Sequence, residues 1–198
     1  MPSESRLILF DFDGTLTVKN SLLEFIKFYH GYIRFYIGMA ILSPVMAAYL
    51  LKLLPNWRAK EIVLTWFFKD ISITHFNKKC ISFSEFVIPT LLRQKGIETL
   101  KRYQVDSQIV IVSASAENWI APWCRIHKID CIATILEVKE NKLTGKIKGK
   151  NCFGIEKVNR IKKRINLSKY SSIIGYGDSI GDAEMLKVAT KAYYKPFR

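Results

Sequence analysis

The sequence predicts an α/β protein in which a parallel sheet is interrupted by an inserted helical region. Three short apolar runs, at residues 7–10, 109–112 and 172–174, end in polar residues and precede helix-like stretches. Such runs are typical of parallel strands that are buried on both faces. The long stretch from 18 to 96 contains aromatic-rich, helix-like sequence without a clear strand. We therefore expect an α/β core that is split by an all-helical insertion.

The segments around these runs fit the same organisation. Residues 134–148 alternate apolar and polar side chains around a polar turn, as in a β-hairpin, and residues 154–165 have the spacing of an amphipathic helix. Within the insertion, residues 20–30 and 76–92 present broad apolar faces. The predicted division is a core of residues 1–17 and 97–198, with a helical cap of residues 18–96 that closes over the edge of the sheet.

Length and composition allow one well-filled core with an inserted unit. The chain has 198 residues, 49% of which are hydrophobic, so a wholly disordered protein is excluded. It carries 31 Lys and Arg residues against 17 Asp and Glu residues, which gives a net charge of +14, and ten of the basic residues lie between Lys139 and Arg164. This charge attracts anions such as phosphorylated metabolites, nucleic acid or an acidic lipid surface, without choosing among them.

The cysteine pattern and the N-terminus indicate a reducing environment. The four cysteines form no C-x-x-C pair, and no histidine stands at zinc-finger spacing from any of them, so we expect free thiols. The apolar run at residues 7–10 is too short for a signal peptide. These features predict a cytoplasmic protein.

Residues that suit phosphate or metal binding follow all three predicted strands. They are Asp11, Asp13 and Gly14 after the first strand, Ser113 and Ala114 after the second, and Asp178 and Asp182 after the third. Ligands of an open α/β sheet bind at the carboxyl ends of its strands, so we expect these residues to share one site. Carboxylates this close together are costly unless a cation neutralises them or one of them is protonated, and a donor set poor in histidine favours Mg²⁺ as that cation.

This set of groups is suited to phosphoryl transfer. An ionised Asp11 can attack phosphorus in line to give an aspartyl phosphate, while Asp13 protonates the leaving oxygen and later activates water. Ser113, Lys157 and backbone N–H groups are candidates to hold the phosphoryl oxygens, because this chemistry depends on positioning and electrostatics. The N-terminus of a helix predicted near residues 117–125 adds a positive end.

Each of these residues also has an ordinary structural interpretation. An Asp-x-Asp-Gly sequence by itself is usually a turn, Ser113 alone could cap a helix, and Lys157 is one of many lysines. The ordered combination of the motifs is what indicates an enzyme.

Taken in order, the motifs resemble those of haloacid dehalogenase superfamily phosphatases, in the phosphoserine-phosphatase-like branch. The matching stretches are Asp11-Phe12-Asp13-Gly14-Thr15-Leu16-Thr17, Ser113-Ala114-Ser115, Lys157 and Gly177-Asp178-Ser179-Ile180-Gly181-Asp182. The resemblance implies a Rossmann-like core, with Asp11 as nucleophile and Asp13 as general acid and base. It implies phosphate binding by Ser113, Ala114, Lys157 and Gly14. It also implies Mg²⁺ binding by Asp11, the Asp13 backbone carbonyl and Asp178, with Asp182 in support.

The insertion contains an unusually apolar segment. Residues 35–51 are seventeen consecutive positions without a charge, and Pro44 interrupts them. As one helix they would reach about 26 Å, short of the roughly 30 Å hydrocarbon core of a bilayer. One hypothesis is that Pro44 divides the segment into two helices that lie on a membrane surface. In that case Arg58 and Lys60 are expected to face anionic headgroups, and aromatic side chains are expected at the boundary. These are Tyr29, Tyr32, Tyr36, Trp57 and Trp66. The other hypothesis is a buried cap helix.

Two classes of substrate follow from these features. An amphiphilic phosphate fits the apolar segment, which is similar in composition to that of bacterial phosphatidylglycerophosphate phosphatases, and it predicts peripheral contact with an anionic membrane. Free phosphoserine fits the motifs, but phosphoserine phosphatases carry a cap Glu nine residues after the nucleophile, where this chain has Asn20 and, nearby, Glu24. A hypothesis of another class is a basic protein that binds phospholipid or nucleic acid without turnover, although no specific nucleic acid partner is expected.

Overall fold

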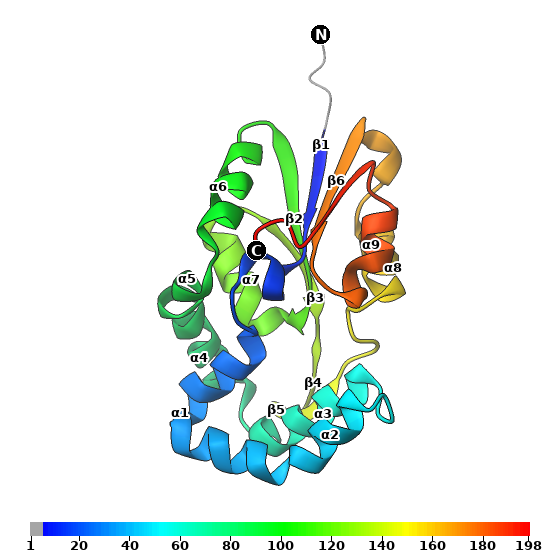
Figure 1. Ribbon diagram of the computed structural model, residues 1–198. Coiled ribbons are helices and arrows are strands. Elements are labelled where there is room, and N and C mark those ends of the chain that lie inside the picture. The colour runs from blue at the N-terminus through cyan, green and yellow to red at the C-terminus, as the bar shows by residue number, and fades with distance from the viewer. Residues whose placement is uncertain (1–5) are drawn as a thin grey trace.

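A five-stranded parallel sheet forms the centre of the molecule, in the computed structural model that describes residues 6–198 (Figure 1). The strand order is β3-β2-β1-β6-β7, and every neighbouring pair is parallel. The strands are β1 (Arg6–Phe10), β2 (Ser107–Ala116), β3 (Asp130–Thr134), β6 (Ser172–Gly177) and β7 (Lys191–Tyr194). The predicted α/β core is confirmed, and β3 and β7 are additions that the sequence pattern did not reveal.

Helices cover both faces of this sheet, and the alternation along β1 decides which side chains meet them. Leu7 and Leu9 pack in one apolar cluster with residues of α8 and α9, whereas Ile8 and Phe10 belong to a larger cluster with α6 and α7. Successive side chains of a strand point to opposite faces, so both faces of β1 are buried. The helices are α6 (Gln94–Tyr103), α7 (Glu117–Ile126), α8 (Ile155–Arg164) and α9 (Ala183–Lys187).

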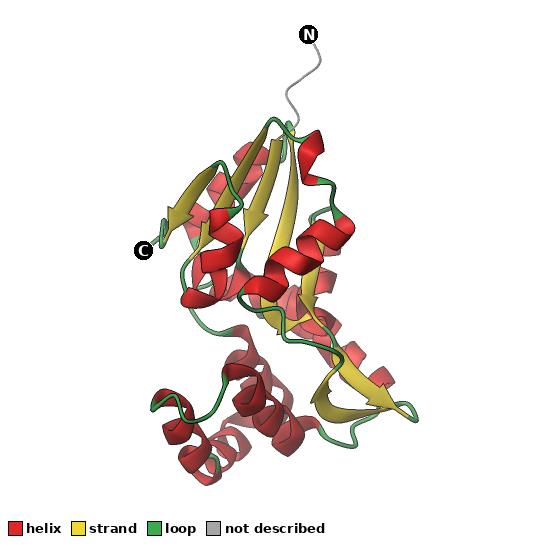
Figure 2. Ribbon diagram, turned by 90° about the vertical axis from the view of Figure 1, so that its right-hand side faces the viewer, coloured by secondary structure: helices red, strands yellow, loops and turns green. Residues whose placement is uncertain are grey.

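The inserted region forms a helical cap at the end of the molecule that the carboxyl ends of the strands face (Figures 1 and 2). Its helices are α1 (Ser21–Ile41), α2 (Ser43–Leu50), α3 (Asn56–Phe68), α4 (Ile73–Phe86) and α5 (Ile88–Leu91). Phe25 of α1 stacks on Trp119 of α7, with ring centroids 5.0 Å apart and planes 18° apart. Cap and core therefore share one apolar cluster, which fixes the cap against the sheet.

The two helices that contain the apolar segment of the insertion, α1 and α2, are bent at two places. Gly31 has a φ of +79° inside α1, a left-handed conformation that glycine adopts without steric cost. A second break at Leu42 separates α1 from α2, and the two helices differ in direction by 60°. Pro44 lies in the first turn of α2, where its missing N–H is tolerated. Within residues 6–198, no single helix is long and apolar enough to cross a bilayer, and only the bent α1–α2 pair meets the requirement by length and composition.

The predicted hairpin is formed by β4 (Leu136–Lys139) and β5 (Lys142–Ile147), which pair antiparallel. It extends from the core to the cap, as Figure 2 shows. The Asp70 N–H donates to the Leu143 carbonyl at 2.8 Å, and the Leu143 N–H donates to the Ile71 carbonyl at 2.9 Å. A β-hairpin that lies between β3 and α8 in the sequence thus supplements the helical cap. The division of the chain at residues 17 and 96 remains a prediction.

Candidate active site

The carboxyl ends of β1, β2 and β6 converge on one buried site. Asp11 directly follows β1, Ser113 lies near the end of β2, and Asp178 directly follows β6. The parallel register aligns these ends, because Phe10 pairs with Ile111 on one side and with Tyr176 on the other. The site therefore lies where ligands of open α/β sheets bind.

Lys157, from the first turn of α8, joins the motifs to one another. Its ammonium donates at 2.6 Å each to Asp11 Oδ1, to Asp182 Oδ1 and to the carbonyl of Val112 on β2. The side chain is 1% exposed. Burial alone would lower the pKa of Lys157, but the charges of Asp11 and Asp182 outweigh burial and raise the pKa above its ordinary value. Lys157 therefore stays a cation at neutral pH.

Asp11 is the carboxylate in the middle of this site. Its Oδ1 accepts from Lys157, and its Oδ2 accepts from the Thr15 hydroxyl at 3.2 Å. Burial raises the pKa of Asp11 to about 7, with further raising by the charges of Asp182 and Asp13, while Lys157 opposes the rise. The group is thus poised between its protonated and ionised forms near neutral pH, so a cation that binds there competes with a proton.

Asp178 and Asp182 complete the acidic group. Asp182 Oδ2 accepts from the N–H groups of Asp178 and Ser179 at 3.1 and 2.9 Å. Burial raises the pKa of Asp182, but Lys157 and the hydrogen bonds from Ser179 outweigh it and hold that pKa below its ordinary value. Burial and the charge of Asp182 raise the pKa of Asp178, although Arg198 forms an ion pair with its Oδ2. A cation bound beside Asp178 would therefore favour its ionised form.

The acidic group fits a hard divalent cation. One carboxylate oxygen from each of Asp11, Asp178 and Asp182 lies within 4.8 Å of the other two, and all three side chains are buried. Oxygen donors of this kind suit Mg²⁺. Gly14 makes room for this arrangement, because a Cβ at its position would lie 2.4 Å from Asp178 Oδ2 and its φ is +84°. Asp11 and Asp178 would hold the ion, with Asp182 orienting Lys157 and the backbone of the loop.

The carboxylate of Asp13 is held by residues at the start of the cap and near the end of β2. Asp13 Oδ1 accepts from the Ser21 N–H at 2.6 Å, and Oδ2 accepts from the hydroxyls of Ser21, at 3.1 Å, and Ser115. Asp13 and Asp11 are therefore held in different orientations, since the chain turns after β1 instead of continuing as a strand. The predicted metal contact of Asp13 was through its backbone carbonyl, and it stays a prediction.

The residues predicted to bind phosphate lie around the same site. Ser113 is buried, and its hydroxyl oxygen accepts from the Ser115 N–H at 3.0 Å. The Gly14 N–H donates to the Thr17 hydroxyl at 3.2 Å. Hydrogen bonds to nearby residues thus position the Ser113 hydroxyl and the Gly14 N–H group. Their contact with a phosphate stays a prediction.

One residue of the site was assigned elsewhere by the sequence. Lys60, expected to face lipid headgroups, instead extends from α3 into the core, where its ammonium donates to the Ala114 carbonyl at 2.8 Å and to Asn151 Oδ1 at 3.0 Å. Burial lowers the pKa of Lys60 to about 8, although the charges of Asp13 and Asp11 oppose the fall. The cap therefore contributes a second cation. Local sequence gave no sign of this, because the contact joins residues 54 positions apart.

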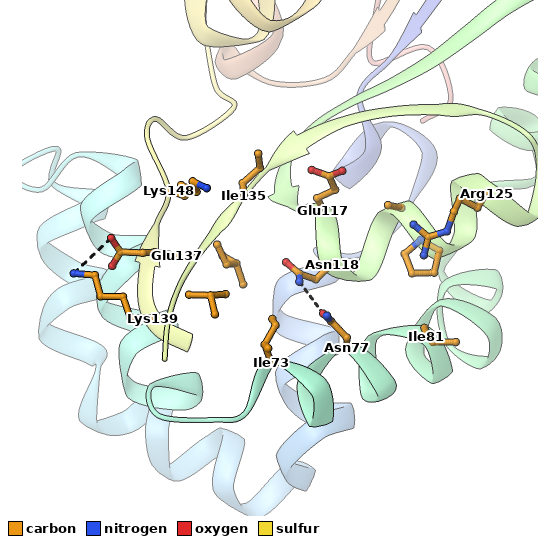
Figure 3. Close-up of a pocket in the computed structure, with 14 residues that line it drawn as sticks. Ile73, Asn77, Ile81, Glu117, Asn118, Arg125, Ile135, Glu137, Lys139 and Lys148 are labelled. Carbon is orange, nitrogen blue, oxygen red and sulfur yellow. Dashed lines mark hydrogen bonds and ion pairs between the residues drawn. The ribbon is translucent and has the colours of Figure 1, made fainter. Parts of the chain in front are cut away.

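A separate groove of about 730 Å³ lies between α4, α7 and the hairpin. Figure 3 shows its lining, in which the side-chain amides of Asn118 and Asn77 are hydrogen bonded at 2.8 Å. Glu117, Arg125 and Lys148 lie around it. Its lining contains none of the motif residues, so the chemistry of the site described above does not extend into it.

Comparison with known proteins agrees with this geometry. The model of the haloacid dehalogenase-like hydrolase family matches residues 8–187. Protein CicA of Caulobacter vibrioides is 32% identical over 201 aligned positions, which cover 100% of this chain and 89% of CicA. A protein of unknown function from Bordetella pertussis Tohama I has a similar structure, with a TM-score of 0.82, 22% identity and coverage of 95% of this chain and 88% of that one.

A phosphoserine phosphatase, solved as an analogue of its phospho-aspartyl intermediate, is also similar. Its TM-score is 0.61 at 22% identity, with coverage of 96% of this chain and 85% of that chain. These structural likenesses support the fold, and the family match spans nearly the whole chain together with all the motifs. The chain belongs to the haloacid dehalogenase-like hydrolase family.

Proposed function

We propose that the protein is a Mg²⁺-dependent phosphomonoester hydrolase that forms an aspartyl phosphate on Asp11. The observation that carries this proposal is the buried constellation in which Lys157 contacts both Asp11 and Asp182, with Asp178 beside them. Such a site offers a carboxylate nucleophile, a fixed cation and oxygen ligands for a metal. The similarity to a phosphoserine phosphatase solved with a phospho-aspartyl analogue supports the same chemistry.

The side chains divide the reaction between them. An oxygen of Asp11 attacks phosphorus, and the bond from phosphorus to the leaving alcohol oxygen breaks while Asp13 gives that oxygen a proton. In the second step Asp13 takes a proton from water, whose oxygen attacks phosphorus, so inorganic phosphate leaves and Asp11 is restored. Lys157 and Ser113 hold the equatorial oxygens. Bound Mg²⁺ supplies neutralisation of the phosphoryl charge.

The contacts of Asp13 support its role as acid and base. Ser21 and Ser115 both hydrogen bond to this carboxyl group, and Ser21 Oγ also accepts from the indole N–H of Trp119 at 3.1 Å. Ser21 begins α1, so the cap and the core fix the carboxyl group together. A proton donor held in this way keeps its position relative to the leaving oxygen, which is what general acid catalysis requires.

The test is release of phosphate from p-nitrophenyl phosphate with and without Mg²⁺. We expect Mg²⁺-dependent hydrolysis by the native protein and none by Asp11→Asn. Asp130→Asn is the matched control, because Asp130 is exposed and its carboxylate contacts Gln108 at the opposite end of the strands. Hydrolysis that survives Asp11→Asn in contaminant-free protein would overturn the proposal. Tight lipid or oligonucleotide binding, with no hydrolysis of any phosphate monoester, would support the non-catalytic alternative.

We also propose that the substrate is an amphiphilic phosphate, such as phosphatidylglycerophosphate, that a cytoplasmic enzyme reaches at a membrane surface. Recognition of phosphoserine needs a carboxylate for the ammonium group. Asn20 instead caps α1 by accepting from two backbone N–H groups, and Glu24 pairs with Lys27 at 2.8 Å. The similar phosphoserine phosphatase structures favour the alternative of a small soluble phosphomonoester. Catalytic efficiencies with phosphoserine and with a dispersed lipid phosphate monoester separate the two.

A further inference from the structure

The cap carries an exposed apolar surface on the second arm of α1, on α2 and on the turn that follows. We call it the apolar cap face, and its main side chains are Ile33, Ile37, Ile41, Leu50, Leu51 and Leu53, which are between 51% and 80% exposed. Ile33, Ile37 and Ile41 recur at every fourth position, so they form one stripe along the helix. Large apolar side chains gathered on one surface mark a site of interaction.

The helix α2 is covered on one side only, where Val45 and Met46 pack against the apolar cluster shared by cap and core, whereas Pro44, Ala47 and Leu50 are exposed. It contains no charged residue, and none of its eight residues, all within the described part of the chain, is buried. Figures 1 and 2 place α1 and α2 at the end of the molecule opposite the N-terminal edge of the sheet. The apolar cap face is therefore a terminal surface of the molecule that an extended, flat partner can reach.

The charged residues within the segment that carries the apolar cap face all have one sign. Between Glu24 and Glu61 the sequence has no acidic residue, and Arg34, Lys52 and Arg58 are exposed. A second copy would bring two positive surfaces together, which like-charge repulsion opposes in a chain of net charge +14. An anionic surface with an apolar interior complements both the charge and the exposed isoleucines.

We propose that the apolar cap face docks on an anionic lipid bilayer, with α1 beyond Gly31 and α2 lying in the interface instead of crossing it. The 60° bend between the two helices and their modest length suit two segments in one plane. This inference names the surface at which the proposed phosphatase meets an amphiphilic substrate, and it rests on that proposed function for its substrate. Lys60 and Tyr29 are not part of this surface, since one enters the catalytic site and the other joins the aromatic cluster of the cap.

The start of α3 links the docking surface to the catalytic site. Arg58 is exposed and lies over the ring of Trp57, whereas Lys60, two residues on, reaches Asn151 and Ala114 in the core. A cavity of about 570 Å³ has both Trp57 and Asn151 in its lining, together with Pro55, Phe153 and Ile155. Asn56, Glu61, Lys150 and Glu156 also line this cavity, and Asn151 accepts from Lys60, so the cavity adjoins the side chain by which the cap reaches the catalytic site.

The test uses the catalytically inactive Asp11→Asn protein and two kinds of vesicle. One kind contains phosphatidylcholine alone, and the other contains equal parts of phosphatidylcholine and phosphatidylglycerol. We expect co-sedimentation with the anionic vesicles only, weakened by salt because the charges are exposed. The double substitution Ile33→Glu with Ile37→Glu should lower the affinity for anionic vesicles about tenfold or more. The two charged carboxylates would then either lose their hydration on docking or keep the apolar cap face apart from the bilayer.

The matched control is Val105→Glu with Ile126→Glu. Val105 and Ile126 are 86% and 59% exposed at the opposite end of the core, so this variant changes the net charge equally without touching the apolar cap face. Equal weakening by both variants, absence of binding to anionic vesicles, or a dimer in solution that Ile33→Glu with Ile37→Glu dissociates would overturn the proposal.

The failure of docking and the failure of the proposed catalysis have different signatures. In the Asp11-containing protein, the Ile33 and Ile37 substitutions should leave hydrolysis of soluble p-nitrophenyl phosphate unchanged, because neither side chain contacts the site. Vesicle binding without any hydrolysis by the native protein would refute the phosphatase proposal and leave the docking surface standing. Hydrolysis without vesicle binding would refute only the docking surface.

Discussion

Lys157 provides the sharpest stability test of the site, because its ammonium is the positive charge between two buried carboxylates. Substituting Lys157→Met keeps most of the side-chain volume and removes the charge, and it breaks the three 2.6 Å contacts to Asp11, Asp182 and Val112. Breaking a buried ion pair by removing one partner costs about 3–5 kcal/mol. We therefore expect the free energy of unfolding to fall by about that amount in metal-free protein.

Urea denaturation of the metal-free protein measures this change. Lys162→Met is the control, since Lys162 is exposed on the same helix and a surface substitution of this kind shifts stability by only about 0.5 kcal/mol. The double variant Lys157→Met with Asp182→Asn should recover part of the loss, because one of the two unpaired carboxylates is then neutral. If Lys157→Met costs no more than Lys162→Met, the ion-pair network does not stabilise the site as argued.

Three further predictions concern the metal, the glycine and the cap. Mg²⁺ affinity should rise with pH and level off above the Asp11 pKa of about 7, because below that pH a proton occupies the carboxylate. Calorimetric titration at several pH values measures this dependence, and an affinity that does not change with pH would contradict it. Gly14→Ala should weaken Mg²⁺ binding at least about tenfold, because the new Cβ would displace Asp178; unchanged affinity in the same titration would show that the loop adjusts freely. With p-nitrophenyl phosphate as substrate, Lys60→Met should lower kcat/KM about tenfold or more, whereas Arg58→Met should leave it unchanged. Equal effects of the two substitutions would mean that Lys60 acts only through surface charge.

The parts of the fold that the sequence predicted are those whose signal is local. The apolar runs of β1, β2 and β6, the alternation of the hairpin and the spacing of α8 are each contained within a few consecutive residues. β3 and β7 lack such a run, since Asp130–Thr134 and Lys191–Tyr194 mix polar with apolar residues and β7 is largely exposed at the edge of the sheet. These segments are strands because they pair with β2 and β6, and no local sequence pattern encodes that pairing.

The site shows the same division between local and distant information. The motifs were sufficient to predict that Asp11, Lys157 and Asp182 meet. They did not reveal that Asp13 accepts hydrogen bonds from Ser21, because that contact depends on how the chain turns after β1, where Asp13 and Gly14 have non-helical backbone angles. The sequence also did not predict that Lys60 reaches the core, since the pattern of an amphipathic helix does not indicate which of its basic side chains contacts another part of the chain.

The central claim is that Asp11 itself carries the phosphoryl group during turnover. Acid quenching of the enzyme during hydrolysis, followed by peptide mass analysis, tests it directly, because acyl phosphates outlast the quench. We predict the mass of one added phosphoryl group on the peptide that contains Asp11, present with substrate and Mg²⁺ and lost in Asp11→Asn. A phosphoryl group on any other residue, or steady turnover with no labelled peptide under conditions that trap a known aspartyl phosphate, would contradict the account.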